Sequence, residues 1–154
     1  MKSRIYQEGI FKSKWLSKFI NCLFFFGNKW KTEKLVYLSF FYLKKKFDSN
    51  GLFLFFEALE YLKPWVGLKL SISKAKTKKI KAYPVVLNKS VQFKKSIFWL
   101  IKSIQLRKEI FIYKKINNEI KEIIFNEATN SINKKKEYYD LAIMAKSIEK
   151  FKWN

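Results

Sequence analysis

The chain has 154 residues, 49% of them apolar and 19% aromatic, which is enough for one domain with a buried core and excludes a wholly disordered protein. Its 33 Lys and Arg against 12 Asp and Glu give a net charge of +21, an excess that indicates nucleic acid or an anionic membrane surface as the partner. Histidine is absent and Cys22 is the only cysteine, which excludes an internal disulfide, Cys/His zinc sites and the usual His-dependent nucleophilic catalysis.

The chain begins with a basic arm over about residues 1–14, which contains Lys2, Arg4, Lys12 and Lys14. Residues 2–18 also have the basic, amphipathic character of a mitochondrial presequence. Glu8 is atypical of a presequence, however, and a basic arm is the simpler interpretation. No secretory signal peptide is expected, because no apolar core follows the basic start.

Three amphipathic helices are predicted in the next part of the chain. The first has apolar residues every three or four positions, and Gly27 and Asn28 end it. These apolar residues are Trp15, Leu16, Phe19, Ile20, Leu23 and Phe26. The second is expected to begin at Thr32 and Glu33 and to end in the lysines of residues 44–46. Its apolar face consists of Leu35, Val36, Leu38, Phe40 and Leu43. After a turn at residues 48–51, the third helix runs from about Leu52 to Leu62, before Pro64.

Between Glu60 and Glu109 there is no acidic residue, although lysines are frequent. Such a tract stores electrostatic repulsion that a polyanion would relieve. From Leu68 to Leu87 apolar and polar residues alternate around residues 74–79, which have no apolar anchor and four lysines. We therefore predict a β-hairpin over about residues 66–87 that reaches phosphate with its lysine tip. A solvated, disordered loop is the alternative interpretation of this stretch.

Three more helices are predicted after the hairpin. Ser90 can cap the first, which bears Val91, Ile97, Phe98, Leu100, Ile101 and Ile104, with Lys94, Lys95, Lys102 and Arg107 on its other face. The second carries Ile116, Ile120, Ile123, Ile124 and Ala128 and is closed by Asn130 and Ser131. Lys134, Lys135 and Lys136 lead into the last, which carries Tyr138, Leu141, Ala142, Ala145, Ile148 and Trp153. The predicted fold is mainly α: a single domain, residues 1–154, with about six helices and one β-hairpin arm inserted after the third helix.

The remaining polar residues do not indicate an enzyme. Two pairs of carboxylates, Glu57/Glu60 and Glu119/Glu122, are expected on solvated helix faces or in ion pairs with nearby lysines. The four glycines are too far apart to form a phosphate-binding loop. Neither a metal nor a cofactor is therefore expected. Tyr83, Trp99, Phe151 and Trp153 can stack on unpaired bases, although burial in the core is the more probable role for each.

Two partner classes remain, RNA and an anionic membrane. In a peripheral membrane protein, the phenylalanines at residues 24–26 would insert between lipids beside a lysine-rich face. The densest lysines lie instead on the predicted hairpin, far along the chain from residues 24–26, which favours RNA. Integral membrane insertion is not expected, because the longest uncharged runs are about half of the ~20 residues that a membrane-spanning helix needs.

The order of several motifs resembles the family of small-subunit ribosomal protein seven, from Lys18 to Trp153. Five landmarks carry the resemblance: Lys18-Phe19-Ile20-Asn21; Gly27-Asn28-Lys29 followed by Leu35-Val36-Tyr37; Phe55-Phe56-Glu57-Ala58-Leu59-Glu60-Tyr61-Leu62-Lys63-Pro64; Pro84-Val85 with Trp99 beyond it; and Lys152-Trp153. The hairpin lacks the family's usual Gly-Gly, and most of the family's arginines are lysines, which loses bidentate phosphate contacts. Tyr139 stands where the family has a histidine.

This resemblance implies a structural component of the small ribosomal subunit that binds the 3′ major domain of small-subunit rRNA and helps assemble the head. It also implies a hairpin near exit-site tRNA and mRNA, with small-subunit ribosomal proteins nine and eleven as neighbours. The expected RNA contacts are Lys2, Arg4, Lys12, Lys14, Lys29, Lys31, Lys69, Lys74, Lys76, Lys78, Lys79, Lys81, Lys94, Lys95, Lys102, Arg107, Lys134, Lys135 and Lys136. The abundance of Lys, Ile, Asn and Phe is typical of AT-rich coding. Together with the divergence from the family pattern and the lack of a clear presequence, it suggests a protein encoded and used in a mitochondrion, with a plastid as the alternative.

Overall fold

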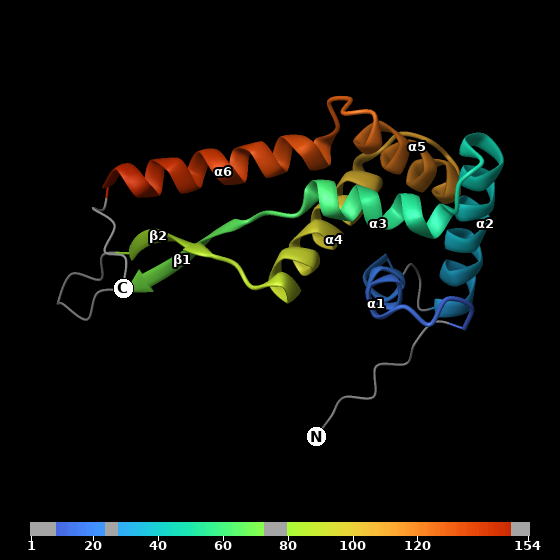
Figure 1. The fold of residues 1–154 in the computed structure, drawn as a ribbon, viewed down its shortest axis with the longest axis horizontal. Helices are drawn as coiled ribbons and strands as arrows, with labels where there is room; N and C mark the ends of the chain where they lie inside the picture. The colour runs from blue at the N-terminus through green and yellow to red at the C-terminus, as the bar shows by residue number, and fades with distance from the viewer. Residues whose placement is uncertain (1–8, 24–27, 73–79, 149–154) are drawn as a thin grey trace, which may run out of the picture.

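The computed structural model describes residues 9–23, 28–72 and 80–148, with six helices and one two-stranded antiparallel hairpin after the third helix (Figure 1). The elements are α1 (Lys14–Leu23), α2 (Lys29–Phe47), α3 (Gly51–Leu62), β1 (Val66–Ile72), β2 (Ile80–Val86), α4 (Lys89–Leu106), α5 (Ile112–Ile124) and α6 (Asn130–Ile148). The mainly α fold and the position of the hairpin predicted from the sequence are confirmed.

Helices α1 to α5 share one hydrophobic core, to which α6 contributes Ile132. Phe19 of α1 and Phe55 of α3 are fully buried at its centre, with ring centroids 5.0 Å apart. Trp99 of α4 is also buried, as expected. No helix in the described part of the chain is long and apolar enough to cross a membrane.

The second helix begins three residues earlier than predicted. The side chain of Asn28 accepts a hydrogen bond from the backbone N–H of Lys31, and Thr32 lies inside the helix with its hydroxyl bonded to the Asn28 carbonyl. An Asn at the N-cap satisfies an N–H that has no partner within the helix, and this cap decides the start. The predicted apolar face was also partly wrong, because Leu38 is exposed and Ser39 is buried.

The turn at residues 48–51 is confirmed and joins α2 closely to α3. Asp48 adopts a left-handed conformation (φ 51°) after α2, and the Asn50 side chain caps α3 through the N–H of Leu52. A Cβ atom at Gly51 would lie 2.6 Å from the carbonyl oxygen of Phe40. Only glycine therefore fits where α3 begins against α2.

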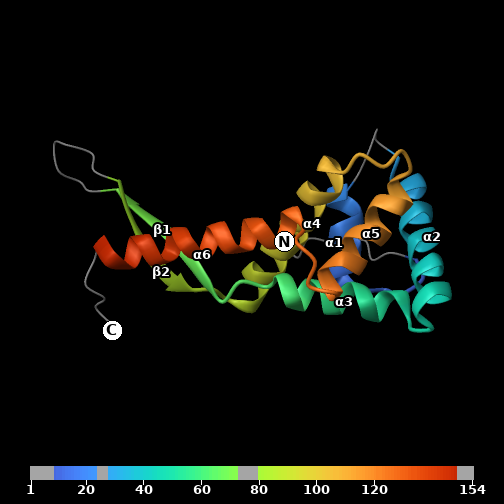
Figure 2. The ribbon, with the colours of Figure 1, turned by 90° about the horizontal axis from the view of Figure 1, so that it is seen from above.

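The strands of the hairpin pair in register from Val66 with Val86 to Ile72 with Ile80. Helix α6 runs along this hairpin and packs on both strands (Figures 1 and 2). The hydroxyl groups of Tyr138 and Tyr139 accept hydrogen bonds of 3.0 Å from the backbone N–H groups of Leu68 and Trp65. These bonds occupy donors at a strand edge that would otherwise be open. The predicted lysine tip, residues 74–79, lies outside the described residues.

Helix boundaries after the hairpin also differ from the prediction. Helix α4 begins after Asn88, so Ser90 is not its cap. Asn126 takes a left-handed conformation (φ 58°) just after α5, which leaves Ala128 outside that helix. The Thr129 hydroxyl then accepts the N–H of Ile132 at 3.3 Å, so α6 begins at Asn130 and not after the lysines.

Three apolar residues expected to face the core, Val91, Phe98 and Leu141, are exposed instead. Ser96 and Ser103 of α4 are buried. The apolar stripe of α4 is therefore displaced around the helix, because small polar residues fill part of its packed face. The side chain of Ile148, and Phe26, Phe151 and Trp153 altogether, lie outside the description.

Candidate nucleic-acid interface

Most of the predicted contact residues lie in three places: the start of the chain, the hairpin, and the facing sides of α4 and α6. Six of them fall outside the described residues: Lys2, Arg4, Lys74, Lys76, Lys78 and Lys79. Lys81 is placed only by its backbone, which pairs with Ser71 in the hairpin. Lys69 of β1 and Lys94 of α4 are exposed.

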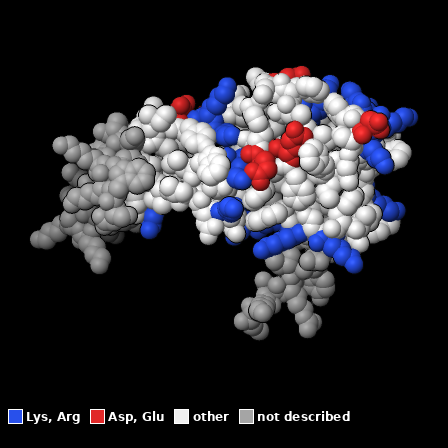
Figure 3. Space-filling model, in the orientation of Figure 1, with Lys and Arg blue, Asp and Glu red and all other residues white. Residues whose placement is uncertain are grey.

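A first basic edge is formed by the segment before α1, the first residue of α1 and the start of α2. Lys12 (φ 48°), Lys14 and Lys31 are exposed, while Lys29 makes an ion pair of 3.6 Å with Glu33. Figure 3 shows Lys and Arg atoms along the lower edge of the coloured part of the molecule, while Asp and Glu atoms appear only higher in this view, together with further Lys and Arg atoms. In this view the lower edge is therefore basic without acidic atoms beside it, which suits a polyanion there.

A second basic region lies between α4 and α6, and we call Lys95, Lys102 and Lys134 the lysine strip. The Lys95 ammonium group lies 3.8 Å from the ring centroid of Tyr138 and hydrogen-bonds to its hydroxyl. Burial, and after it the nearby charge of Lys102, lower the pKa of Lys134, although Glu137 and Glu119 oppose the shift. The packing of α6 on α4 therefore brings together lysines about 30 residues apart in the sequence.

Lys135 and Lys136 differ from the strip. The Lys135 ammonium group donates to the backbone carbonyl of Tyr61, in the last turn of α3, and burial lowers its pKa. A cation at this position satisfies a terminal carbonyl and complements the helix dipole, so Lys135 already has a structural contact. Lys136 is exposed.

Arg107 is held by carboxylates, and we call Arg107, Glu109, Glu119 and Glu122 the Arg107 cluster. Its guanidinium donates from Nε to Glu119 Oε2 at 2.8 Å, from Nη1 to Glu109 Oε1 at 3.0 Å, and from Nη2 to Glu122 Oε2. Burial by itself lowers the pKa of Arg107, but its bonds and attraction to the three carboxylates outweigh burial and raise it. All the cationic groups of this side chain are engaged within the fold.

The expectation for the second carboxylate pair was therefore wrong. Glu119 is 1% exposed and accepts hydrogen bonds from Arg107 and from the Ser131 hydroxyl, so it is neither solvated nor paired with a lysine. Glu122 also bonds to Arg107. The sequence analysis did not predict this cluster, although the sequence itself contained a signal for it. Arg107 is one of only two arginines in a chain with many lysines. The planar guanidinium group of arginine presents several donors in a fixed geometry, which suits buried carboxylates better than the single ammonium group of lysine does.

The sequence pattern of the family described as "Ribosomal protein S7p/S5e" matches residues 1–146. The chain belongs to this family. Among similar proteins of the family, the small ribosomal subunit protein uS7 of Sulfurimonas denitrificans is 27% identical over 97% of this chain and 94% of its own length. The uS7 protein of Wigglesworthia glossinidia brevipalpis is 29% identical over 92% of this chain and 88% of its own length. The small ribosomal subunit protein uS7m of Reclinomonas americana is 28% identical over 98% of this chain and 92% of its own length.

Membership in this family confirms the resemblance seen in the sequence. The family is one of ribosomal proteins, not of enzymes, which agrees with the expectation that the chain has no catalytic activity. The match extends over α1 to α5, the hairpin and most of α6, and it therefore includes both basic regions.

Proposed function

We propose that the chain is a structural component of the small ribosomal subunit and that its two basic regions bind rRNA. Family membership supports this proposal most strongly, since the similar proteins are named small ribosomal subunit proteins. The charge of the chain supports it independently, because 33 basic residues against 12 acidic ones exceed what ion pairing within the fold can use. Both observations favour RNA over the alternative of a peripheral protein on an anionic membrane.

The chemistry of the interface follows from lysine. An ammonium group is a compact point charge that contacts a phosphate without the bidentate geometry of arginine. Lys12, Lys14 and Lys31 on the first edge and the lysine strip on the second would each neutralise backbone phosphates. Such contacts fix the position of the protein on RNA and provide affinity, while they carry little sequence information.

The finer assignment rests on the family resemblance. It implies rRNA binding in the 3′ major domain, with small-subunit ribosomal proteins nine and eleven as neighbours. The hairpin supports this orientation because it projects from the helical body and is held along its length by α6 (Figure 1). Its tip would reach towards exit-site tRNA and mRNA.

The proposed location is the mitochondrial ribosome. Two observations support it: the bias towards Lys, Ile, Asn and Phe, and the similarity to the mitochondrial relative uS7m. Bacterial relatives are similar to a comparable degree. Fractionation of cells of the source organism, with detection of the chain in mitochondrial or in other ribosomes, decides between the two.

Two measurements test the central proposal. The full chain should sediment with small ribosomal subunits and not with a membrane fraction that lacks rRNA. Its affinity for the 3′ major domain should fall by roughly 10³–10⁵ between 50 and 200 mM salt if it makes about six to ten phosphate contacts. A nearly flat salt dependence, or recovery only with membranes, would contradict the proposal.

A separate test concerns the hairpin tip. Replacing Lys74, Lys76, Lys78 and Lys79 with serine keeps the length of the loop and removes its charge. We expect the helical body to remain folded and to bind rRNA through its basic regions, whereas tRNA retention at the exit site should weaken. Loss of all rRNA binding in this variant would show that the tip is the main anchor.

A further inference from the structure

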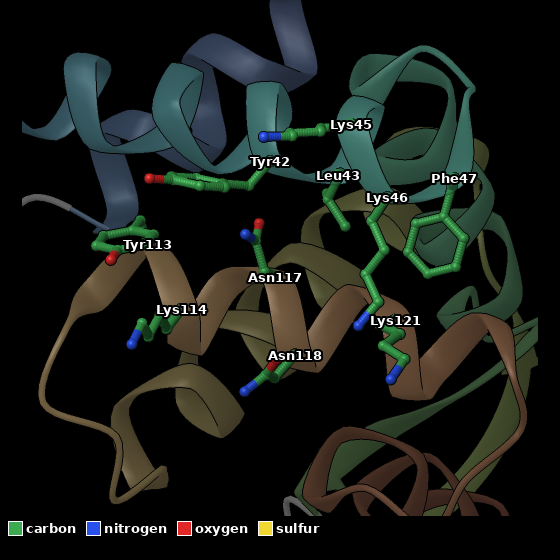
Figure 4. A pocket seen from close by; sticks show the side chains of 10 residues that line it. All are labelled: Tyr42, Leu43, Lys45, Lys46, Phe47, Tyr113, Lys114, Asn117, Asn118 and Lys121. Carbon is green, nitrogen blue, oxygen red and sulfur yellow. The ribbon is translucent and has the colours of Figure 1, made fainter.

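A groove with a volume of about 490 Å³ lies between α2 and α5, at the end of the molecule away from the hairpin (Figure 1). Its walls come from the last two turns of α2 and from one face of α5 (Figure 4). No residue of this groove belongs to the predicted contact set or to the two basic regions. The two helices pack closely, so the groove is a fixed feature of the body.

Positive charge is concentrated around this hollow. Four lysines line it: Lys45 and Lys46 from α2, and Lys114 and Lys121 from α5. None of the four takes part in an ion pair within the described ranges. Glu109, the acid bonded to the groove residue Asn118, is already bound by Arg107. The charge of the lysines is therefore available to an anionic ligand.

The groove also presents an aromatic face. The rings of Tyr42 and Tyr113 stack with centroids 5.3 Å apart and planes at 18°, and Tyr42 is 45% exposed. At the other end Phe47 meets Phe125 with ring centroids 5.8 Å apart. A half-exposed tyrosine that is already held parallel by a second ring offers a rigid surface on which a further planar group can stack.

A polar group with base-pairing chemistry lies between these ends. The Oδ1 atom of Asn117 is buried and has no hydrogen-bond partner among the residues that the structure describes. Figure 4 shows the Asn117 amide directed into the space beside Tyr42 and Leu43. A buried acceptor without a partner is costly, and a donor from a ligand would satisfy it. An amide pairs well with the edge of a nucleobase.

We propose that this groove binds an unpaired nucleotide of a single-stranded RNA segment. The base stacks on Tyr42 and bonds to Asn117, while the lysines of α2 and α5 contact the flanking phosphates. An acidic peptide would use the lysines but neither the tyrosine face nor the amide. The proposal goes beyond the interface proposed above, because it adds to the two basic regions a third contact surface that binds an exposed base.

The first test uses a fluorescent oligouridylate of about ten nucleotides, a length within the usual site size for single strands. The double variant Lys46→Ala/Lys121→Ala of the full chain should lower the slope of log K against log salt by about 1.4, since each contact with a single strand contributes roughly 0.7. The matched control, Lys34→Ala/Lys108→Ala, removes the same charge from exposed lysines outside the groove and should leave the slope unchanged. Equal slopes for the two variants would overturn the proposal.

The second test addresses the base. Tyr42→Leu should weaken oligouridylate binding roughly five- to 150-fold through the lost stacking, whereas Tyr42→Phe should bind as the wild type does. Thermal unfolding of both variants checks that the fold is kept. Wild-type affinity in Tyr42→Leu would overturn the proposal. The proposal would also be overturned if an oligoglutamate peptide bound the groove with an affinity that depends on Lys46 and Lys121 and is unchanged by Tyr42→Leu. Neither result affects rRNA binding by the two basic regions, which is measured separately on the 3′ major domain.

Discussion

Two regions of α4 and its neighbours use positive charge in opposite ways. In the Arg107 cluster, one guanidinium is surrounded by three carboxylates, and one of these, Glu119, is fully buried. In the lysine strip, Lys102 and Lys134 lie close to one another, and Lys95 contacts the ring and hydroxyl of Tyr138. The first region neutralises its charge within the fold, while the second keeps a surplus.

This difference shows that the role of a basic residue depends on the carboxylates within its reach. Arg107 lies at the end of the same acid-free tract as Lys95 and Lys102. It becomes structural because α5 returns along α4 and places Glu119 and Glu122 beside it. Lys102 and Lys95, 5 and 12 residues earlier, make no ion pair with the acidic residues that the structure describes, so their charge is available to RNA.

The largest expected difference between the Arg107 cluster and the lysine strip is in their contribution to the stability of the fold. Arg107→Met should lower the free energy of unfolding by about 3–5 kcal/mol, because it leaves the buried Glu119 carboxylate without its cation. Lys102→Ala, an exposed lysine in the last turns of α4 before Arg107, should change it by no more than about 0.5 kcal/mol. Chemical denaturation of both variants provides the measurement.

A second variant shows whether the buried charge is the cause. Arg107→Met/Glu119→Gln removes both charges and should be more stable than Arg107→Met alone by about 1 kcal/mol or more. If the two are equally unstable, the loss in Arg107→Met comes from packing and the contrast with the strip is not electrostatic.

The next effect is on RNA affinity. Replacing all three lysines of the strip with alanine should lower the salt slope for the 3′ major domain by about 2.7, or roughly 0.9 for each lost phosphate contact. The change in affinity between 50 and 200 mM salt would then be about 40-fold smaller than for the wild type. An unchanged slope would mean that the strip does not face RNA.

A smaller effect concerns the tyrosine that joins the strip to the hairpin. Tyr138→Phe removes the acceptor of the Leu68 N–H and the partner of Lys95, and should cost about 1 kcal/mol of stability. Hydrogen exchange should show faster exchange at Leu68. Tyr83→Phe is the control, since its hydroxyl has no hydrogen bond in the described part of the chain; similar exchange in both variants would assign no role to the Tyr138 bond.

The smallest effects are those of pH on the Arg107 cluster. Burial by itself would raise the pKa of Glu109, but hydrogen bonds from the Asn118 side chain and from the Glu109 backbone N–H, together with Arg107, outweigh burial and lower it. The contribution of Glu109 to stability is therefore present above the usual 4.5 and is lost as pH falls through the lowered value. Burial raises the pKa of Glu122, with Glu119 and Glu127 adding repulsion that Arg107 does not offset. Its contribution is present below pH 4.5 and is lost as pH rises through the raised value.

Urea unfolding across this pH range tests both signs. Glu109→Gln should differ most from the wild type above pH 4.5, and Glu122→Gln should gain stability relative to the wild type as pH rises from 4.5. Glu57→Gln, an exposed carboxylate on α3, is the control. Opposite trends would mean that Arg107 does not divide its charge among the carboxylates in this way.

The sequence predicted the elements of the fold well because their patterns are local. Apolar spacing located six helices, and alternation around Leu68 located the hairpin. Helix starts were less predictable where several cap residues stand close together. Asn28, Asn88 and Thr129 each precede the position that sequence reasoning selected. Tertiary packing chooses among such candidates, as the exposed Phe98 and the buried Ser103 also illustrate.

The sequence predicted that the candidate site is rich in lysine, but not which basic residues make contacts within the fold and which stay available to RNA. An excess of lysine in an acid-free tract is visible in the sequence. The bonds between Arg107 and Glu119, and between Lys135 and the Tyr61 carbonyl, join segments that only the packed fold brings together. The groove of Tyr42 and Tyr113 was not predicted for the same reason, since its two walls are about 70 residues apart.

The hydrogen bonds that Tyr138 accepts from Leu68 of β1, and Tyr139 from Trp65 just before β1, have a mechanical consequence. A free two-stranded ribbon bends and twists easily, and alone it is only marginally stable. Here the ribbon is fastened side by side to a helix of 19 residues, about 28 Å long, whose first turn is embedded in the core through Ile132. Helix α6 therefore stiffens the hairpin along its length. A force applied near the free end of the hairpin is transmitted to the helical body as a torque at the first turn of α6.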